Sequence, residues 1–441
     1  MLIKRILKFF FRFLPLYKRT RKEILGNGTT DEQKFCQLID HCLSTVPVYR
    51  DYFREAIAKG TPVLFNDFPI VRKKEIIGKE EQFISDKYSK KNLIRNATGG
   101  STGISVNFYA SVREIIKVTA YADYAFSLIG ERESLRIATL RGIYPRHRIS
   151  CWYWGQLVLS SYDLTPENIP RYIKLIEKHK INCLHVYPSS IRIFCKYVKE
   201  MGLSGKLRHI RGILSSSETL SQEDKNLILE LFPAATLVDL YGQSEHVAFA
   251  ISVNRGPYRF LRSFGIPEFI DTEMRCKDHR ICEIVATSLI NKAMPLIRYG
   301  IEDFVVIDSK GEVRSILGRS QDFLIGKNEE ILPCLVVYDH DTMINVISYQ
   351  YFQEKAGEVE LRIKANNCFG EKDRSMLIRD LLTTFDDKIS VRIKVVKEME
   401  KTRAGKQIRV IQCLNIWNYL NSATESLTGT HKDIESAGSS I

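Results

Sequence analysis

Cys183-Leu184-His185-Val186-Tyr187 is a short apolar run that opens a regular alternation of segments up to residue 240. The run has the length of a buried strand, and segment 189–201 after it has the spacing of an amphipathic helix. The same pattern predicts strands at 135–140, 211–214 and 236–240 and helices at 169–180 and 221–231. Strands that alternate with helices of this length indicate right-handed β-α-β units around a parallel sheet. We therefore expect an α/β fold with ligands at the carboxyl ends of its strands.

Polar turns follow two of these predicted strands. The turn after the first strand is Ser215-Ser216-Ser217-Glu218, and the turn after the second is Tyr241-Gly242-Gln243-Ser244-Glu245-His246. A tyrosine ring can stack on a purine, and a glutamate can hold Mg²⁺ that is shared with phosphates. Such turns also occur in sheets that bind nothing, so both interpretations stay open for each turn taken alone.

A glycine-rich loop lies upstream, at Asn96-Ala97-Thr98-Gly99-Gly100-Ser101-Thr102-Gly103. Glycine permits a close approach of the backbone, while backbone N–H groups and hydroxyls donate to phosphate oxygens. The loop is neither a P-loop nor a G-x-G-x-x-G fingerprint. Its composition indicates phosphate binding, and a solvated turn without a ligand is the alternative.

The last third of the chain carries two further polar segments, Pro295–Asp303 and Gly318–Asp322. Asp303 could accept hydrogen bonds from ribose hydroxyls, and Arg319 could approach ribose or phosphate. A surface ion pair is the alternative for these two residues.

Beyond Asp322 the pattern changes to a small α+β unit. It predicts strands near 332–338, 358–364 and 390–396, a helix at 372–385, and then a basic loop, Lys401-Thr402-Arg403-Ala404-Gly405-Lys406-Gln407-Ile408-Arg409. We therefore divide the chain into a large domain at 24–318 and a small domain at 319–421. Residues 422–441, rich in Ser, Thr and Gly, are predicted to be disordered.

The overall composition is that of a globular protein, with 441 residues of which 44% are hydrophobic and 27% charged. Ten cysteines without a C-x-x-C pair fit reduced thiols and a cytoplasmic location. Cys276, His279 and Cys282 could contribute to a zinc site, but no second pair of ligands follows them. Whether they bind a metal is left open.

The N-terminal segment is strongly basic. Residues 1–23 carry a net charge of +7, out of +13 for the whole chain, and no nucleic-acid-binding motif accompanies this charge. Residues 1–14 form an amphipathic pattern with Lys4, Arg5, Lys8 and Arg12 on one arc, and Pro15 ends it. This helix is too short to span a bilayer, but it could lie on an anionic membrane surface, such as the inner face of the cell membrane. The alternative is a helix packed on the protein's own body.

Taken in order, these segments resemble the adenylate-forming superfamily, and more closely its phenylacetate-CoA ligase-like branch, some members of which occur with capsule or O-antigen biosynthesis. Val46-Pro47-Val48-Tyr49-Arg50 and Phe68–Lys73 also resemble this branch, so the resemblance runs from about 35 to 412. It implies a large N-terminal domain with mostly parallel sheets and a small α+β C-terminal domain.

The resemblance also implies an activity and the residues that carry it. A carboxylic acid and ATP would give an acyl-adenylate and pyrophosphate, and the acyl group would then pass to coenzyme A or another acceptor. Lys406 would be the catalytic lysine, Glu245 the Mg²⁺ ligand and Asp322 the hinge. The nucleotide-binding residues would be Thr98, Gly99, Gly100, Ser101, Thr102, Gly103, Ser217, Glu218, Tyr241, Gly242, Ser244, Asp303 and Arg319. The aromatic segments Cys151–Gly155 and Tyr187-Pro188-Ser189 could line an acyl pocket.

The sequence departs from the family pattern at Val106, where a Lys or Arg is common, and at Glu302, where a Gly usually precedes the ribose-binding Asp. No Pro precedes Lys401-Thr402 either. Glu302 adds a side chain and negative charge beside the expected nucleotide site. The competing hypotheses are an inactive adenylate-forming scaffold, which could dock to a membrane through residues 1–14, and acyl transfer from a thioester without ATP. The acid and its acceptor are not identified by the sequence.

Overall fold

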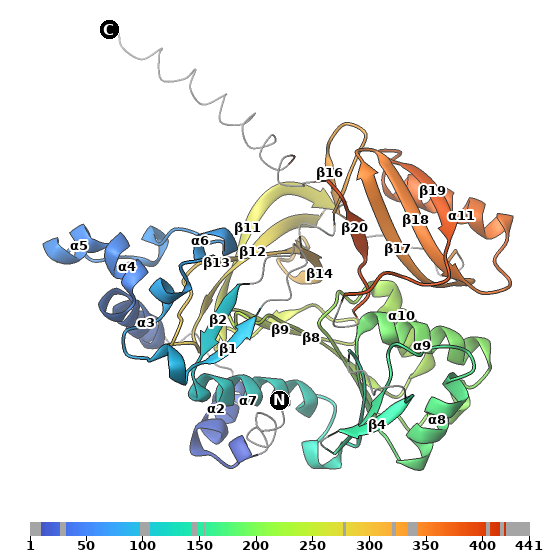
Figure 1. Ribbon diagram of the computed structural model, residues 1–441, viewed down its shortest axis with the longest axis horizontal. Helices are drawn as coiled ribbons and strands as arrows, with labels where there is room; N and C mark the ends of the chain where they lie inside the picture. Colours follow the sequence, from blue (N-terminus) through green and yellow to red (C-terminus); the bar gives the residue numbers. More distant parts are fainter. Residues whose placement is uncertain are drawn as a thin grey trace, which may run out of the picture.

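The computed structural model describes residues 10–26, 32–97, 106–142, 148–153, 155–276, 279–319, 323–333, 342–402, 406–414 and 419. Figure 1 shows a large body made by the chain up to residue 319 and a smaller one, in orange and red, made by residues 323–414. The α/β fold class predicted from the sequence is confirmed.

The large body is built around an eight-stranded sheet with the strand order β10-β9-β8-β7-β6-β3-β5-β4. Its strands are β3 (Ile137–Leu140), β4 (Ser150–Tyr153), β5 (Gln156–Leu159), β6 (Cys183–Val186), β7 (Gly212–Ser216), β8 (Thr236–Gly242), β9 (Phe249–Val253) and β10 (Arg259–Phe260). The strands from β5 through β3, β6 and β7 to β8 are parallel, as predicted, whereas β4, β9 and β10 pair antiparallel.

Helices cover both faces of this sheet. The side chains of Ile213 and Leu237 pack in one core with α8 (Ile169–Lys178), α9 (Pro188–Glu200) and α10 (Gln222–Leu231). Their sequence neighbours Leu214 and Val238 point the other way and pack with α7 (Val112–Ser127). Because neighbouring side chains of a strand face opposite sides, both faces of the sheet are buried, as parallel sheets require.

A second sheet was not predicted. It is antiparallel, with the order β11-β12-β13-β14, and consists of β11 (Gly265–Cys276), β12 (His279–Ser288), β13 (Tyr299–Ile307) and β14 (Val313–Arg319). The hairpin of β1 (Ile94–Ala97) and β2 (Asn107–Ala110) shares a core with this sheet. The glycine-rich residues Thr98–Gly103 connect these two strands and lie outside the described residues.

The start of the described chain packs on α7 through α2 (Pro15–Leu25). The helices after α2 are α3 (Glu32–Thr45), α4 (Pro47–Tyr52), α5 (Arg54–Lys59) and α6 (Lys73–Ile76), of which α3 and α4 belong to a separate core with Phe68 and Ile297. Arg12 donates to both carboxylate oxygens of Asp123 in α7 at 2.7 and 2.8 Å, and the Tyr17 hydroxyl donates to the same carboxylate at 2.8 Å. Arg12, which we placed on the cationic arc, is thus bound to the protein's own body.

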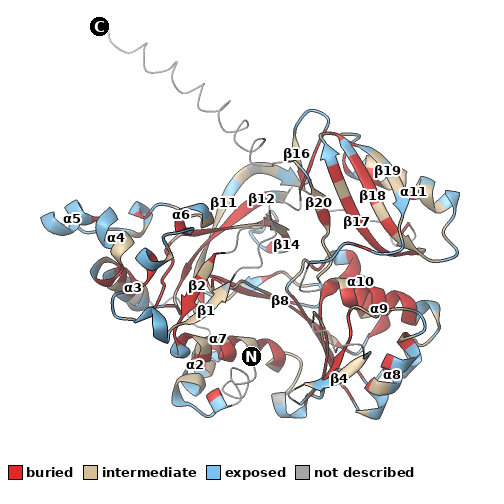
Figure 2. Ribbon diagram, in the orientation of Figure 1, coloured by how far each residue is buried: buried red, intermediate tan, exposed pale blue. Residues whose placement is uncertain are grey.

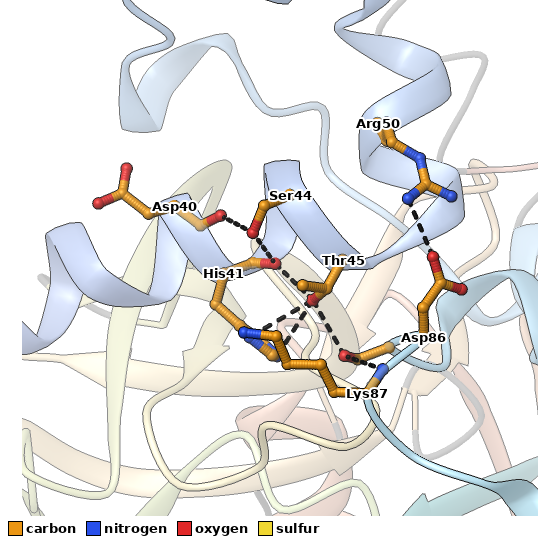
Figure 3. Close-up of polar contacts among 8 residues, drawn as sticks. Asp40, His41, Ser44, Thr45, Arg50, Asp86 and Lys87 are labelled. Atoms are coloured by element: carbon orange, nitrogen blue, oxygen red, sulfur yellow. Dashed lines mark hydrogen bonds and ion pairs between the residues drawn. The ribbon is translucent and has the colours of Figure 1, made fainter.

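Helices α3 and α4 are tied to the segment around Asp86. The backbone N–H of Asp86 donates to the carbonyl of Thr45 at 2.7 Å, and Arg50 forms an ion pair with the Asp86 carboxylate at 2.9 Å (Figure 3). Short 3₁₀ turns lie in this region at Phe65–Asp67, Glu80–Phe83 and Lys90–Asn92, and two more follow α7 and α9, at Arg132–Ser134 and Ser204–Leu207. Within the described residues, none of the helices has the length and apolar character that crossing a bilayer requires.

The small body has its own core under a four-stranded sheet of order β19-β18-β17-β20. Its elements are β15 (Phe323–Ile325), β16 (Ile331–Pro333), β17 (Val346–Lys355), β18 (Glu358–Ala365), α11 (Glu371–Thr384), β19 (Ser390–Val395) and β20 (Val410–Gln412). The prediction missed β17, and residues 334–338 of the strand predicted near 332–338 lie outside the described residues, as does the predicted hinge Asp322. The domain boundary therefore stays a prediction.

The two bodies meet at α9, which lies against β17, and α9 and α10 are largely buried (Figure 2). The Lys196 ammonium donates to the carbonyl of Met343 at 2.7 Å, and the side chain of Ile347 enters the core of the large body. The Arg192 guanidinium stacks on the ring of Tyr349, 4.9 Å from its centroid.

Arg192 also joins α9 to α10 through buried charge. It pairs with Asp224 and, at 3.1 Å, with Glu223, and the three side chains are only 5%, 3% and 8% exposed. Removing one partner from a buried ion pair leaves an uncompensated charge in a medium that solvates it poorly.

Arg192→Met should therefore lower the free energy of unfolding by about 3–5 kcal/mol. Lys199→Met is the matched control, because Lys199 also lies on α9 and pairs with a carboxylate of α10, Glu230, but both groups are exposed. Lys199→Met should lower the free energy of unfolding by less than about 1 kcal/mol. Denaturant unfolding of both variants measures the difference, and equal losses would contradict the role given to the buried pair.

Candidate functional site

A cavity of about 630 Å³ lies where the carboxyl edge of the large sheet meets the small body. The predicted site residues that line it are Ser217, Glu218, Tyr241, Gly242, Ser244, Glu245, Asp303 and Lys406. Three parts of the chain that are far apart in sequence supply them: the ends of β7 and β8, strand β13, and the segment before β20. The predicted residues Thr98–Gly103 lie outside the described chain, and of Arg319 only the backbone is described.

The ends of β7 and β8 meet because the two strands are parallel neighbours in the sheet. Ser217 follows β7 with a left-handed backbone, φ 75°, and His246 lies after β8 with φ 55°. Residues other than glycine rarely adopt this backbone conformation. Where they do, they occur more often than elsewhere at active sites and ligand-binding sites. Both turns line the cavity, so the sheet brings together the two polar turns that the sequence singled out.

Tyr241 and Asp303 are bonded to each other inside the cavity. The Tyr241 hydroxyl donates to Asp303 at 2.7 Å, and burial, together with this carboxylate, raises the pKa of Tyr241 well above its ordinary value. The hydroxyl therefore stays protonated and fixes the orientation of Asp303. Tyr241 was predicted to stack on a purine and Asp303 to bind ribose; both assignments stay predictions.

Strand β13 bulges just before Asp303. Glu283 of β12 faces Phe304, whereas Val285 faces Gly300, so residues 301–303 lie opposite a single residue of β12. Glu302, inside the bulge, has φ 65°. Bulges re-aim side chains beside active sites, and a left-handed residue inside one is most often glycine. The backbone at 302 thus has a conformation that favours the glycine of the family pattern, although the residue is glutamate.

The same strand places Asp303 opposite Arg319 of β14. The two residues predicted to contact the ribose therefore lie at facing register positions on neighbouring strands. Gly318, next to Arg319, lines the cavity.

Glu245 is the cavity carboxylate to which we assigned Mg²⁺. Its side chain is 5% exposed and lies among the residues that line the cavity. No group of three His, Cys, Asp or Glu side chains suited to a metal is found among the described residues. A carboxylate with phosphates and waters is nevertheless the usual environment of Mg²⁺, so a single protein ligand fits this metal better than it fits zinc. The facing positions of Cys276 and His279 at the end of the β11–β12 hairpin do not complete such a group.

Lys406 reaches the cavity from the small body. Its ammonium lies 5.9 Å from the centroid of the Tyr187 ring, and its backbone N–H donates to the hydroxyl of Thr402 at 3.2 Å. The next residue, Gln407, donates its backbone N–H to Glu218 at 3.1 Å. Lys406 and Glu218 are thus brought together although 188 positions of sequence separate them, and their opposite charges attract.

Sequence reasoning missed several residues that line the cavity, above all Asp239 and Tyr349, while Asn96 and Arg409 come from the glycine-rich and basic loops that it had singled out. Asp239 accepts a hydrogen bond from the Tyr258 hydroxyl, and burial raises the pKa of its carboxyl to about 6. The signal was available, because Asp239 is the one charged residue in the otherwise apolar strand Thr236–Leu240.

The described residues of the aromatic segment 151–155, which leave out Trp154, do not line this cavity. Trp152 of β4 is 56% exposed and packs edge-on against His179 at the far edge of the sheet. Pro188 and Ser189, from the other segment proposed for an acyl pocket, do line the cavity.

The left-handed backbone at residue 302 leads to a test of stability. Glu302→Gly should be more stable than Glu302→Ala by about 1 kcal/mol, because alanine keeps the Cβ that disfavours this conformation. In an ordinary strand the order of stability is reversed, because there a glycine variant is less stable than an alanine variant. Denaturant unfolding of the two variants measures it, and a more stable alanine variant would mean that residue 302 does not hold the left-handed conformation in solution.

Comparison with known proteins adds independent findings. Residues 149–287 match the model of the family described as AMP-binding enzyme. The chain is 23% identical to protein CapK from Staphylococcus aureus over 403 residues, which cover 85% of this chain and 87% of that protein.

Solved structures resemble most of the chain. Crystal structures of 2-hydroxyisobutyryl-CoA ligase in the postadenylation state, in complex with R3-HIB-AMP and with 2-HIB-AMP, superpose with TM-scores of 0.60 and 0.61 at 14% identity. Each alignment covers 92% of both chains. These findings confirm the resemblance that the sequence motifs indicate: residues 149–287 match the AMP-binding enzyme family, and the chain as a whole has the fold of adenylate-forming enzymes.

Proposed function

We propose that this protein activates a carboxylic acid with ATP, forming an acyl-adenylate and pyrophosphate, and transfers the acyl group to coenzyme A or another acceptor. The observation that carries the proposal is a single cavity that gathers Lys406, Glu245, Tyr241 and Asp303. A cation, a buried carboxylate, an aromatic ring and a second carboxylate are the groups that phosphate, Mg²⁺, a purine and a ribose would need.

The chemistry places most demand on charge. Attack of the acid on the α-phosphate joins two negatively charged groups, so catalysis depends on positioning and on nearby cations. The Lys406 ammonium would stabilise the negative charge on the oxygens of the α-phosphate as the acid attacks, and Asp303, fixed by Tyr241, would hold the ribose. Mg²⁺, if held by Glu245, would neutralise phosphate oxygens.

The acceptor and the biological role are finer parts of the proposal. Coenzyme A is favoured because the fold is shared with a CoA ligase, and a carrier-protein thiol or an amino sugar is the alternative. Similarity to CapK over most of the chain supports a place in the capsule-related branch that the motifs resemble. A screen of carboxylic acids for exchange of pyrophosphate into ATP would identify the acid.

Lys406→Ala separates the two half-reactions. With the acid found by the screen, the variant should lose pyrophosphate exchange by on the order of 10²- to 10³-fold, as when one donor is removed from a catalytic charge site. It should still convert a supplied acyl-adenylate to product. Unfolding should barely change, because Lys406 is only partly buried.

The matched control is Lys397→Ala, which removes an exposed lysine of the small body that does not line the cavity. It should exchange pyrophosphate at the parent rate. Exchange by Lys406→Ala at the parent rate would show that Lys406 is not the catalytic lysine. If none of the acids in the screen supports pyrophosphate exchange by the parent protein, that result would instead support the inactive scaffold or transfer from a thioester.

We also propose a peripheral contact of residues 1–14 with anionic membranes. Arg12 is bound to Asp123, but Phe10 and Phe13 on the same segment are 57% and 63% exposed. Exposed aromatic rings within residues 1–23, which carry a net charge of +7, suit an anionic lipid surface, where rings enter the interface and cations meet headgroups.

Replacing both rings, Phe10→Ser with Phe13→Ser, should weaken binding to anionic vesicles by on the order of tenfold or more. Substitution is preferable to deletion of residues 1–14, because deletion would also remove the Arg12 anchor. Leu64→Ser, at a residue 64% exposed, is the control for a lost surface apolar group. Cosedimentation measures binding, which added salt should also weaken. Equal binding by parent and double variant would reject the membrane contact.

A further inference from the structure

The Glu218 carboxylate joins two elements that belong to different bodies. One oxygen accepts the backbone N–H of Ser189, in the first turn of α9, at 2.9 Å. The other oxygen accepts the backbone N–H of Gln407, the residue after Lys406, at 3.1 Å. A residue predicted to lie against a nucleotide thus uses both oxygens of its side chain on backbone groups.

We propose that Glu218 is a positioning residue that holds Lys406 in the cavity by accepting the hydrogen bond from Gln407. This inference rests on the proposed function, because Lys406 must be the catalytic cation for its position to matter. Glu218 need not touch the nucleotide or the acid; it would act through the backbone beside Lys406.

The large body holds Glu218 rigidly. α9 has 13 residues, and the N–H groups of its first turn carry partial positive charge that favours a carboxylate. The preceding residue, Ser217, has a left-handed backbone, and its hydroxyl accepts a hydrogen bond from Arg141 at 3.1 Å. Burial raises the pKa of Glu218, while the N–H groups of Ser189 and Gln407 and the charge of Lys406 oppose that rise. The carboxylate is therefore held by groups that stabilise its ionised form.

The segment around Lys406 is also held by hydrogen bonds within the small body. The N–H of Thr402 donates to the carbonyl of Lys406 at 2.8 Å, and the side-chain amide of Gln407 donates to the carbonyl of Tyr349 at 2.6 Å. The segment is thereby attached to the small body, and the bond to Glu218 ties it to the large one. In Figure 1 this red segment before β20 lies on the α9–α10 side of the large body.

This arrangement predicts opposite effects on the two half-reactions. Docking at Glu218 favours the step in which Lys406 meets the phosphate. A conformational step that takes Lys406 out of the cavity must first break the bond to Gln407. Weakening this bond should therefore slow adenylation while leaving the transfer step unchanged or faster.

A double-mutant cycle tests whether Glu218 acts through Lys406. Glu218→Ala should slow pyrophosphate exchange by on the order of ten- to a hundredfold, the cost of one charge-assisted hydrogen bond, and Glu218→Gln, which keeps one acceptor oxygen, should slow it less. In the Lys406→Ala background, Glu218→Ala should add little further loss, because the residue it positions is gone. Full multiplication of the two losses would overturn the proposal.

Binding of AMP distinguishes positioning from a nucleotide contact. Calorimetric titration with AMP should give the same affinity for the parent and Glu218→Ala, whereas a direct contact with the nucleotide would weaken it. Glu230→Gln is the matched control, since Glu230 is an exposed carboxylate of α10 paired with Lys199. It should change neither exchange nor AMP binding.

A readout without any substrate keeps the inference separate from the proposed function. Trypsin cuts after lysine, so the Lys406–Gln407 bond reports on the segment directly. Glu218→Ala should raise the rate of cleavage at this bond several-fold over the parent and the Glu230→Gln control. If cleavage does not change, the docking role fails even where Lys406 proves catalytic. If cleavage rises but Lys406→Ala exchanges pyrophosphate at the parent rate, the proposed function fails at Lys406, and with it the inference that rests on it.

Discussion

A parallel sheet buried on both faces is the constraint on which the rest of this structure depends. Alternate residues of β7 and β8 enter two different cores, and helices close both of them. Polar side chains on these strands therefore have room only at the strand ends. The turns after β7 and β8 carry the polar residues of the candidate site because they are the first positions where the chain leaves the core.

The exception within the strands is informative. Asp239 is a carboxyl group on a buried strand. It accepts a hydrogen bond from the Tyr258 hydroxyl, and burial raises its pKa to about 6. A buried carboxyl that is easily protonated has little structural advantage over an apolar residue of similar size. Its position in the cavity wall gives it access to a ligand, which is a physical reason for its presence in an otherwise apolar strand.

The seam between the bodies combines apolar burial with ionic contacts. Ile347 packs into the core of the large body, while Arg192, Asp224 and Glu223 form a buried charge network beside it. The cavity runs along this seam, and residues of both bodies line its wall. Such a site can be rigid while the two bodies are docked, yet it can be dismantled by separating them. This geometry suits a reaction in two steps that need different surroundings.

Sequence by itself determined the local structure and the order of the motifs. Apolar runs and amphipathic spacing located the parallel strands β3, β6, β7 and β8 and the helices between them to within two residues, because periodicity reflects burial directly, but they missed the short parallel strand β5. Tertiary structure decided what could not be read from local pattern: the antiparallel sheet, whose central strands β12 and β13 are buried over most of their length and show no simple alternation, and the left-handed backbone at Glu302. It also decided that Glu218 binds backbone N–H groups of Ser189 and Gln407 and that Arg12 binds Asp123. These pairs are distant in sequence, and only the packing of whole elements brings them within hydrogen-bonding distance.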